Sequence, residues 1–388
     1  MFPGTTRMLD LIGRRVRILI CAGGTGGHVY PALAAVASLR VARAAAGDLE
    51  LLWVGSVGGM EVEMVREAGI KMETILAGGV VGKGLSGGVL GLAKLAAGAA
   101  KALRVISRFR PEAIFVTGGY TAVPVTLAGW LRRIPMVVYL PDVQPGLAVC
   151  WAARLSRRVL VTMAESGRYF NNSNVTVTGY PLRPEIVRAT RETRESARER
   201  LNLGAGRPTV LVVGGSRGAR SINQAALAAG PEWIGDGAQV LHVSGQLDWS
   251  AVQKQRKEFS PETRAHYHIF PYLRDEMGLA LRAADIAVAR AGASCLGEFP
   301  AFGLPAVLVP YPHAWRYQRS NAEALSEHGA AIWIEDKDLQ RSLSLTAGEL
   351  LRDSDRLAAM GRKAAALAVP EAAERVAAEL IAMAAGAG

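Results

Sequence analysis

The stretch from Arg290 to Asn321 carries residue types that suit a phosphorylated sugar. Small residues at 291–294 follow the apolar run 286–289, which predicts a turn from a strand into a helix. At such a turn, backbone N–H groups and the helix dipole favour phosphate. Glu298 lies about one helical turn further on, where a carboxylate can accept hydrogen bonds from vicinal hydroxyls. These features predict a nucleotide-sugar site, and an ordinary turn with a solvated glutamate is the alternative.

A second glycine-rich turn, Gly23 to His28, follows the first apolar run of the chain. Its glycines allow close backbone approach to a phosphate or sugar. It is neither a dinucleotide fingerprint, since Val29 stands at the third glycine position, nor a phosphate-binding loop with Gly-Lys-Ser/Thr. His28 begins the next predicted helix and could take a proton from an attacking hydroxyl near neutral pH. A helix-capping or packing histidine is the alternative.

Two further turns repeat the strand–glycine–helix theme, at Gly118-Gly119-Tyr120 and at Gly214 to Ala219. Each is weak evidence alone, because such turns also serve close packing. No Asp-x-Asp stands at a strand end to hold a metal–diphosphate. We therefore expect a reaction without metal or cofactor, in which helix dipoles and Arg183 or Arg290 balance the diphosphate charge.

Apolar strand-like runs alternate with helical patterns along both halves of the chain, which predicts parallel, doubly wound α/β sheets. The predicted strands lie at 16–21, 51–54, 114–117, 136–140, 159–162 and 175–178, and then at 209–213, 240–244, 267–270, 286–289 and 306–310.

The run Gly179 to Pro184, with two prolines, separates the two halves. We expect an acceptor- and membrane-facing domain at 1–180 and a donor domain at 181–369. The Ala-rich segment 370–388 is predicted to be helical and to pack back on the first domain. Glycine-rich turns at the strand ends of two similar halves imply a ligand cleft between them.

Charge is unevenly distributed along the chain. Residues 1–180 hold 20 Lys+Arg against 10 Asp+Glu (+10), whereas residues 181–388 hold 25 against 24 (+1). Nucleic acid is not expected as a partner, because zinc-finger spacing, RNP-like motifs and basic heptads are missing from the sequence. An anionic membrane surface or a diphosphate substrate fits better, and a basic surface serving solubility is the alternative. Three cysteines without CxxC spacing indicate a reducing cytoplasm.

Two segments bear on membrane contact. The uncharged stretch 113–131 contains Gly118-Gly119 and Pro124, so we expect a strand, a turn and a helix start rather than a membrane span. The stretch 87–108 combines apolar residues with basic ones, which are Lys94, Lys101, Arg104 and Arg108. Such a helix can rest on acidic headgroups, although an amphipathic helix packed on the sheet is the alternative.

Taken in order, GGTGGHVYPALA, the GGY turn, GGSRGA and RAGASCLGEFPAFGLPAVLVP resemble the MurG family over nearly the whole chain. MurG enzymes are peripheral membrane transferases of peptidoglycan synthesis that use UDP-N-acetylglucosamine (UDP-GlcNAc). The resemblance implies a GT-B fold of two Rossmann-like domains facing across a cleft. It also implies inverting transfer to the 4-hydroxyl of the muramyl sugar of lipid I, the undecaprenyl-diphosphate-linked muramyl peptide, at the cytoplasmic face of the cell membrane.

Carried over residue by residue, the resemblance makes His28 the candidate general base. It places the donor against Thr25, Gly26, Gly27, Arg183, Ser216, Arg274, Ala293, Ser294, Cys295, Leu296, Gly297, Glu298, Tyr317, Gln318 and Asn321. It places the acceptor side of the cleft at Gly118, Gly119, Tyr120 and Asp142.

The sequence departs from the family pattern at three places. Asp142 stands where the family has an amide, Tyr317 takes the first place of the usual polar pair, and the loop 78–84 keeps Lys83 without the usual arginine. A related GT-B transferase with another nucleotide sugar or lipid acceptor therefore stays an alternative. So does a UDP-sugar-binding protein or an epimerase acting on free UDP-GlcNAc.

Overall fold

The computed structural model of the 388-residue chain describes residues 14–44, 47–76, 85–170, 174–215, 218–313 and 317–386, without the side chains of 85–94. The chain forms two compact units. Unit 1 comprises Met1–Arg183 and Glu371–Gly388, and unit 2 comprises Pro184–Pro370.

Unit 1 is built on a seven-stranded parallel sheet in the order β3-β2-β1-β4-β5-β6-β7. Its strands are β1 (Val16–Cys21), β2 (Leu49–Ser56), β3 (Lys71–Ile75), β4 (Ala113–Val116), β5 (Met136–Leu140), β6 (Arg158–Val161) and β7 (Val175–Val177). The strand order reverses between β1 and β4, so the turns that follow these two strands open side by side at the same edge of the sheet.

Unit 2 repeats the design with a six-stranded parallel sheet in the order β10-β9-β8-β11-β12-β13. Its strands are β8 (Thr209–Val213), β9 (Gln239–Val243), β10 (Tyr267–Phe270), β11 (Ile286–Ala289), β12 (Ala306–Leu308) and β13 (Ala331–Trp333). The equivalent reversal lies between β8 and β11. The predicted doubly wound α/β class is confirmed for both units.

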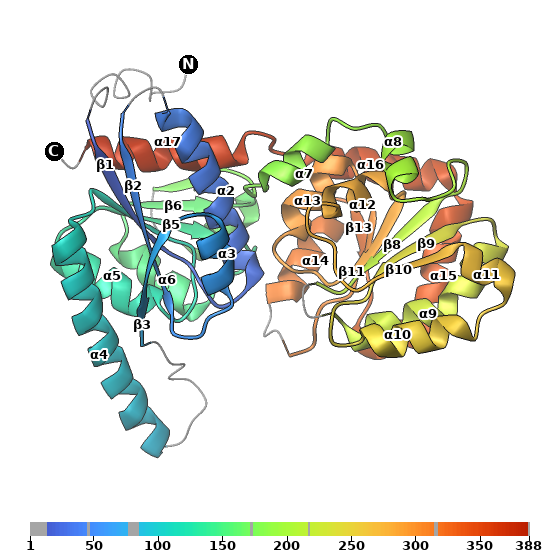
Figure 1. Ribbon diagram of the computed structural model, residues 1–388, viewed down its shortest axis with the longest axis horizontal. Helices are drawn as coiled ribbons and strands as arrows, with labels where there is room; N and C mark the ends of the chain where they lie inside the picture. Colours follow the sequence, from blue (N-terminus) through green and yellow to red (C-terminus); the bar gives the residue numbers. More distant parts are fainter. Residues whose placement is uncertain are drawn as a thin grey trace. The chain divides into compact units, whose positions relative to one another are not determined.

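Helices connect the strands of each unit (Figure 1). Those of unit 1 are α2 (Gly26–Arg43), α3 (Glu61–Glu67), α4 (Leu85–Phe109), α5 (Ala122–Leu131), α6 (Leu147–Leu155) and α17 (Ala372–Ala385). Those of unit 2 are α7 (Pro184–Ala189), α8 (Arg194–Arg200), α9 (Arg220–Gly235), α10 (Trp249–Lys257), α11 (Pro261–Ala265), α12 (Met277–Ala283), α13 (Cys295–Phe302), α14 (Tyr317–Glu327), α15 (Leu339–Arg352) and α16 (Ser354–Ala366). The C-terminal helix α17 packs against α2 and against strands of unit 1.

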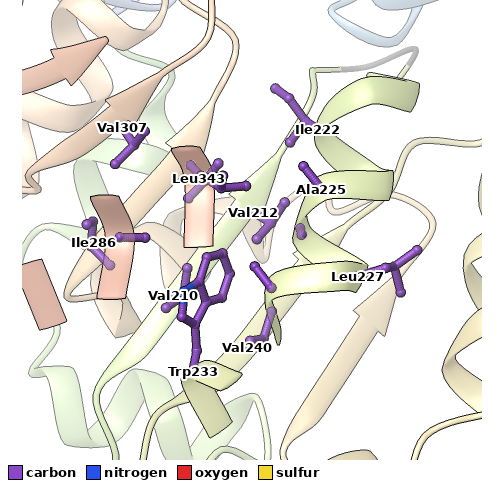
Figure 2. Close-up of a cluster of buried hydrophobic side chains, with 14 of the residues drawn as sticks. Val210, Val212, Ile222, Ala225, Leu227, Trp233, Val240, Ile286, Val307 and Leu343 are labelled. Atoms are coloured by element: carbon purple, nitrogen blue, oxygen red, sulfur yellow. The ribbon is translucent and has the colours of Figure 1, made fainter. Parts of the chain in front are cut away.

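Apolar side chains cover both faces of each sheet, as parallel sheets require. In unit 1, α2 and α17 contribute to the core on one face, and α4, α5 and α6 to the core on the other. In unit 2, Trp233 of α9 lies among Val210, Val212 and Val240 of the sheet (Figure 2). Its indole N–H donates to the carbonyl of Ser344 at 3.2 Å, so the buried indole is satisfied and ties α9 to α15.

Two edge strands are missing from the sequence prediction. Strand β3 carries Lys71 and Glu73 and is half-buried, so it lacks a continuous apolar run. Strand β13 has only three residues. Both are recognisable only by their pairing with an inner strand. The segment 113–131 does form a strand, a glycine turn and a helix, as predicted. Within the described part of the chain, no helix is long and apolar enough to cross a membrane.

Candidate functional site

His28 lies in the first turn of α2, directly after the glycine turn that follows β1. Its half-buried ring packs on the second glycine turn, which follows β4. A Cβ atom built at Gly118 would lie 2.5 Å from His28 Cδ2 and 2.8 Å from Nε2, so a side chain at this position would displace the ring. Thr117 holds the backbone on the other side, since its hydroxyl donates to the carbonyl of His28 at 2.8 Å. The two predicted glycine turns therefore meet around His28.

The surroundings of His28 favour a neutral imidazole. Burial lowers the pKa of His28 below its usual value, and the negative charge of Asp142 partly opposes this shift. The Nδ1 atom lies 3.1 Å from Thr25 Oγ1. If Nδ1–H donates to this hydroxyl, Nε2 keeps its lone pair and faces the Gly118 turn. This is the state that a general base needs.

The two turns meet backbone to backbone. Gly119 has a left-handed conformation (φ 87°), and a Cβ atom there would lie 2.6 Å from the carbonyl oxygen of Gly23. A Cβ atom at Gly24, also left-handed, would lie 3.7 Å from Gly119 Cα. Gly119 is thus required by the contact between the turns, and Gly24 by its left-handed backbone, beyond any role in approaching a ligand.

Glu61 and Trp53, which were not predicted from the sequence, stabilise the first glycine turn. Glu61 is fully buried, and its Oε1 accepts hydrogen bonds from the backbone N–H and the hydroxyl of Ser56, both at 2.8 Å. Its carboxylate also fills the space beside Gly23 and Gly59. The Trp53 indole donates to the carbonyl of Ala22 at 2.9 Å. A signal for Glu61 was present, because three glycines precede this acid within seven residues.

The other predicted residues of unit 1 are Tyr120, Asp142 and Arg183. Tyr120 is 65% exposed beside the second turn, and Asp142 is half-buried just beyond β5. Arg183, the last residue of unit 1, places its guanidinium 4.5 Å from the ring centre of Tyr30 in α2. The geometry within unit 1 therefore brings Arg183 to the helix that carries His28.

In unit 2, the predicted phosphate turn joins β11 to α13. The side chains of Ala293, Cys295 and Leu296 are buried, whereas Ser294, Gly297 and Glu298 are half-buried. The strand–turn–helix arrangement predicted for this stretch is confirmed. A ligand here would meet backbone groups of the turn and the side chains of Ser294 and Glu298.

Amides from the following segment hold this edge together. Asn321 is fully buried in α14, and its Nδ2 donates to the carbonyl of Ala291 at 3.0 Å. Gln318 accepts from the backbone N–H of Tyr311 through Oε1 at 2.8 Å. Both predicted residues thus support the loops that follow β11 and β12, and Gln318 uses its carbonyl oxygen to do so.

Arg290 has a partner that the sequence did not reveal. Its guanidinium donates to Asp336 Oδ1 at 2.5 Å and to the Ser221 hydroxyl at 2.8 Å, and it lies over the ring of Tyr311. An aspartate already offsets its charge, which makes Arg290 a support of this edge rather than the free counter-charge considered from the sequence.

Three further residues were predicted to contact the donor, namely Arg274, Tyr317 and Ser216. Arg274 is exposed just before α12, and Tyr317 is the first residue of α14. Ser216, like the loop 78–84 with Lys83 and the side chain of Lys94, lies outside the described residues. In the described ranges no group of three or more His, Cys, Asp or Glu side chains is arranged to hold a metal ion.

Two doubly wound units, each with its chemistry-bearing turns at the carboxyl ends of parallel strands, are the domains of a GT-B fold. The MurG crystal structure from Acinetobacter baumannii superposes with a TM-score of 0.72 and 26% identity, covering 94% of this chain and 99% of that chain. A UDP-GlcNAc 2-epimerase from Neisseria meningitidis, bound to UDP-GlcNAc, shares the fold at a TM-score of 0.64 and 10% identity.

Family models agree with this class. The N-terminal domain model of glycosyltransferase family 28 matches residues 18–161, and its C-terminal domain model matches 209–376. Two curated relatives carry the name UDP-N-acetylglucosamine--N-acetylmuramyl-(pentapeptide) pyrophosphoryl-undecaprenol N-acetylglucosamine transferase. The protein from Roseiflexus sp. is 39% identical over 93% of this chain and 94% of its own length. The protein from Moorella thermoacetica is 38% identical over 93% and 97%. The chain therefore belongs to glycosyltransferase family 28 and, within it, to the MurG family.

Proposed function

We propose that this protein transfers N-acetylglucosamine from UDP-GlcNAc to the 4-hydroxyl of the muramyl sugar of lipid I, which yields lipid II for peptidoglycan synthesis. The names of its relatives at 38–39% identity support this substrate pair. The observation that carries the proposal is the setting of His28. Its ring lies against the Gly118 turn, and burial favours the neutral form that can accept a proton.

The proposed reaction is a single inverting displacement. The 4-hydroxyl oxygen of the acceptor bonds to the anomeric carbon of the donor while its proton passes to His28 Nε2. The bond from that carbon to the diphosphate breaks, and UDP leaves with the electron pair. The reaction needs a base because a sugar hydroxyl is too weak an acid to ionise at neutral pH, and His28 is the residue that we propose for this role.

Unit 2 is the proposed donor unit. The β11–α13 turn offers backbone groups and the positive end of the α13 dipole to the diphosphate, with Glu298 on the ribose hydroxyls and the backbone near Arg274 at the uracil. Arg183, Thr25 and Ser216 would complete the donor contacts, with Gln318 at the sugar. Unit 1 is the proposed acceptor unit, with Gly118, Gly119, Tyr120 and Asp142 beside His28.

A transfer assay tests the proposal directly. Purified protein is offered UDP-GlcNAc, UDP-glucose, UDP-N-acetylgalactosamine and GDP-mannose, each with and without lipid I, and products are followed by mass spectrometry. We expect lipid II only from UDP-GlcNAc with lipid I. A different sugar or lipid preference would favour the related transferase, and conversion of UDP-GlcNAc without any acceptor would favour an epimerase.

We also propose that unit 1 rests on the anionic cytoplasmic face of the cell membrane. Helix α4 packs along α5 and exposes Lys101 and Arg104. The last turn of α5 adds Trp130 and Leu131, which are 52% and 53% exposed, and two exposed arginines follow them. Apolar side chains among basic ones suit a headgroup interface, and this is the unit that contains the +10 segment.

Vesicle co-sedimentation tests the membrane proposal. Binding to vesicles with acidic lipid should fall steeply with salt, and the double variant Lys101→Glu, Arg104→Glu should lose most of it. The matched control is Lys254→Glu, Lys257→Glu, which makes the same charge change on exposed positions of α10 in unit 2. Equal binding to neutral and acidic vesicles would contradict the proposal and favour a solvated basic surface.

A further inference from the structure

A chain of buried polar side chains runs through unit 2 and takes no part in the proposed chemistry. His242 on β9 and Tyr267 on β10 are fully buried, and Asn223 on α9 is 2% exposed. His242 Nδ1 lies 2.9 Å from the Tyr267 hydroxyl, and its Nε2 lies 2.9 Å from Asn223 Oδ1. Since buried polar groups are costly unless they are paired, such a chain calls for an explanation.

The hydrogen bonds of Asn223 determine where the protons of the chain lie. Its Nδ2 is 2.9 Å from the carbonyl of Ser244 and 3.0 Å from Asp248 Oδ2. Both of these partners are acceptors, so Nδ2 must be the amino group and Oδ1 must face His242. His242 therefore carries its proton on Nε2, and its Nδ1 accepts from the Tyr267 hydroxyl. Every donor in the chain points the same way, from Tyr267 through His242 to Asn223.

Burial keeps this order intact over the working pH range. It lowers the pKa of His242 to about 3, so the imidazole stays neutral. Burial also raises the pKa of Tyr267 far above its usual value, so the hydroxyl keeps its proton. The chain thus has one protonation state near neutral pH.

The chain of hydrogen bonds ends at the loop after β9 and at the turn before α9, both of which lie on the proposed donor edge of unit 2. The Ser244 carbonyl, which accepts a hydrogen bond from Asn223, also packs against Gly218. Gly218 has φ 81°, and a Cβ atom there would lie 2.3 Å from this oxygen. Asp248, the other partner of Asn223, accepts from Arg220 Nε at 3.2 Å through Oδ1. One amide group therefore connects the loop after β9 to Gly218 and to Arg220, the first residue of α9.

We propose that Asn223, oriented by His242 and Tyr267, is a positioning residue for the nucleotide-sugar donor. It holds the loop after β9 and the N-terminal end of α9 in the arrangement that the proposed donor-binding edge of unit 2 requires. This inference rests on the proposed function, because it takes unit 2 as the donor unit. Asn223 itself is buried and acts through Ser244, Asp248 and Arg220.

The decisive variant is Asn223→Asp, which keeps the shape but turns a carboxylate towards the Ser244 carbonyl and Asp248. Affinity for UDP-GlcNAc, measured by calorimetry on the full chain, should fall by on the order of tenfold, as expected when buried hydrogen bonds are lost. The KM for the donor should rise with it, while kcat changes by less than about threefold. The control Gln224→Glu makes the same amide-to-acid change at the next, exposed position of α9 and should bind normally.

A measurement on the parent protein tests the chain without any donor. In ¹⁵N-histidine NMR, His242 should show a proton on Nε2 and no titration between pH 5.5 and 8. Tyr267→Phe keeps the buried ring, removes the first donor, and should shift the Nδ1 resonance and weaken donor binding by a few-fold. A proton on Nδ1 of His242, or unchanged donor affinity in folded Asn223→Asp, would overturn the inference. A parent protein that fails to bind UDP-GlcNAc would instead overturn the proposed function.

Discussion

The two units carry the same kind of sheet, but their ligand-facing edges are held in different ways. In unit 1 the turns after β1 and β4 touch through glycine backbones, with Gly119 against Gly23 and Gly118 against the His28 ring. In unit 2 side-chain hydrogen bonds hold the turns, for example Asn321 to Ala291 and Arg290 to Asp336. The contact between the two turns of unit 1 is a close steric fit between glycines, whereas these contacts in unit 2 are made by polar side chains.

This difference matches the tasks that we propose for the two units. A base must sit at one place with a stiff backbone around it, and glycine-to-glycine contact leaves little room to move. A diphosphate nucleotide needs several donors and acceptors at set directions, which hydrogen-bonded side chains supply. We therefore expect changes at the edge of unit 1 to reduce turnover, and changes at the edge of unit 2 to reduce donor affinity.

The largest expected effect is that of His28→Ala. Turnover should fall by about 10²–10⁴-fold, the usual contribution of general-base catalysis, while donor affinity stays close to that of the parent. Protonated His28 cannot act as a base, so the parent should lose activity as the pH falls through the lowered pKa of this histidine. That acid limb should be missing in the variant. Turnover within a few-fold of the parent would make His28 a structural residue, and Asp142 the next candidate.

Gly119→Ala should break the steric contact in unit 1. A side chain in the left-handed region costs about 1–3 kcal/mol, and here its Cβ would also collide with a backbone oxygen. Turnover should drop with stability. Gly58→Ala is the matched control, because Gly58 is also left-handed (φ 70°) but has nothing within 4 Å of a built Cβ. Thermal unfolding and activity of both variants give the comparison, and equal losses would show that the contact adds nothing.

Glu298→Ala should sharpen the contrast from the side of unit 2. Donor affinity is expected to weaken by about 1–3 kcal/mol through loss of charge-assisted hydrogen bonds to the ribose, with little change in kcat. Glu327→Ala, an exposed acid on α14, serves as the control. Calorimetry with UDP-GlcNAc measures both, and unchanged affinity in folded Glu298→Ala would remove this residue from the donor site.

The smallest expected effect is an acid sensitivity of unit 2 that comes from His242. In the folded protein, burial lowers the pKa of His242 to about 3, whereas in the unfolded chain the pKa returns to its usual value of 6.5. The free energy of unfolding contributed by this group is therefore intact above pH 6.5 and is lost as the pH falls towards 3. Between pH 6.5 and 5 the loss should be about 1.5–2 kcal/mol.

Urea unfolding at both pH values, in the parent and in His242→Gln, isolates this contribution from those of other histidines. In the variant, the free energy of unfolding should depend less steeply on pH, because nearly one proton fewer is taken up on unfolding. Identical slopes would mean that His242 is protonated in the folded protein, which would also remove the basis for its fixed tautomer.

The local sequence was sufficient for most of the architecture. Alternating apolar runs and glycine turns predicted the parallel sheets, and the small residues at 291–294 predicted the turn into α13. Placing His28 at the start of a helix needed only the glycines before it. These features follow from hydrophobic period and turn chemistry, which are properties of neighbouring residues.

What the sequence did not determine depends on contacts between distant residues. Strands β3 and β13 are defined by their partners rather than by their own residues. Gly118 follows His28 by 90 positions, yet its lack of a side chain leaves the space that the His28 ring fills. Asp336 pairs with Arg290 across 46 positions, and no local pattern indicates that this charge is already balanced. The sequence by itself determined which residue types reach the edges of the two sheets. The tertiary structure alone decided which of them brace the turns, because burial and hydrogen-bond geometry exist only once the sheets have formed.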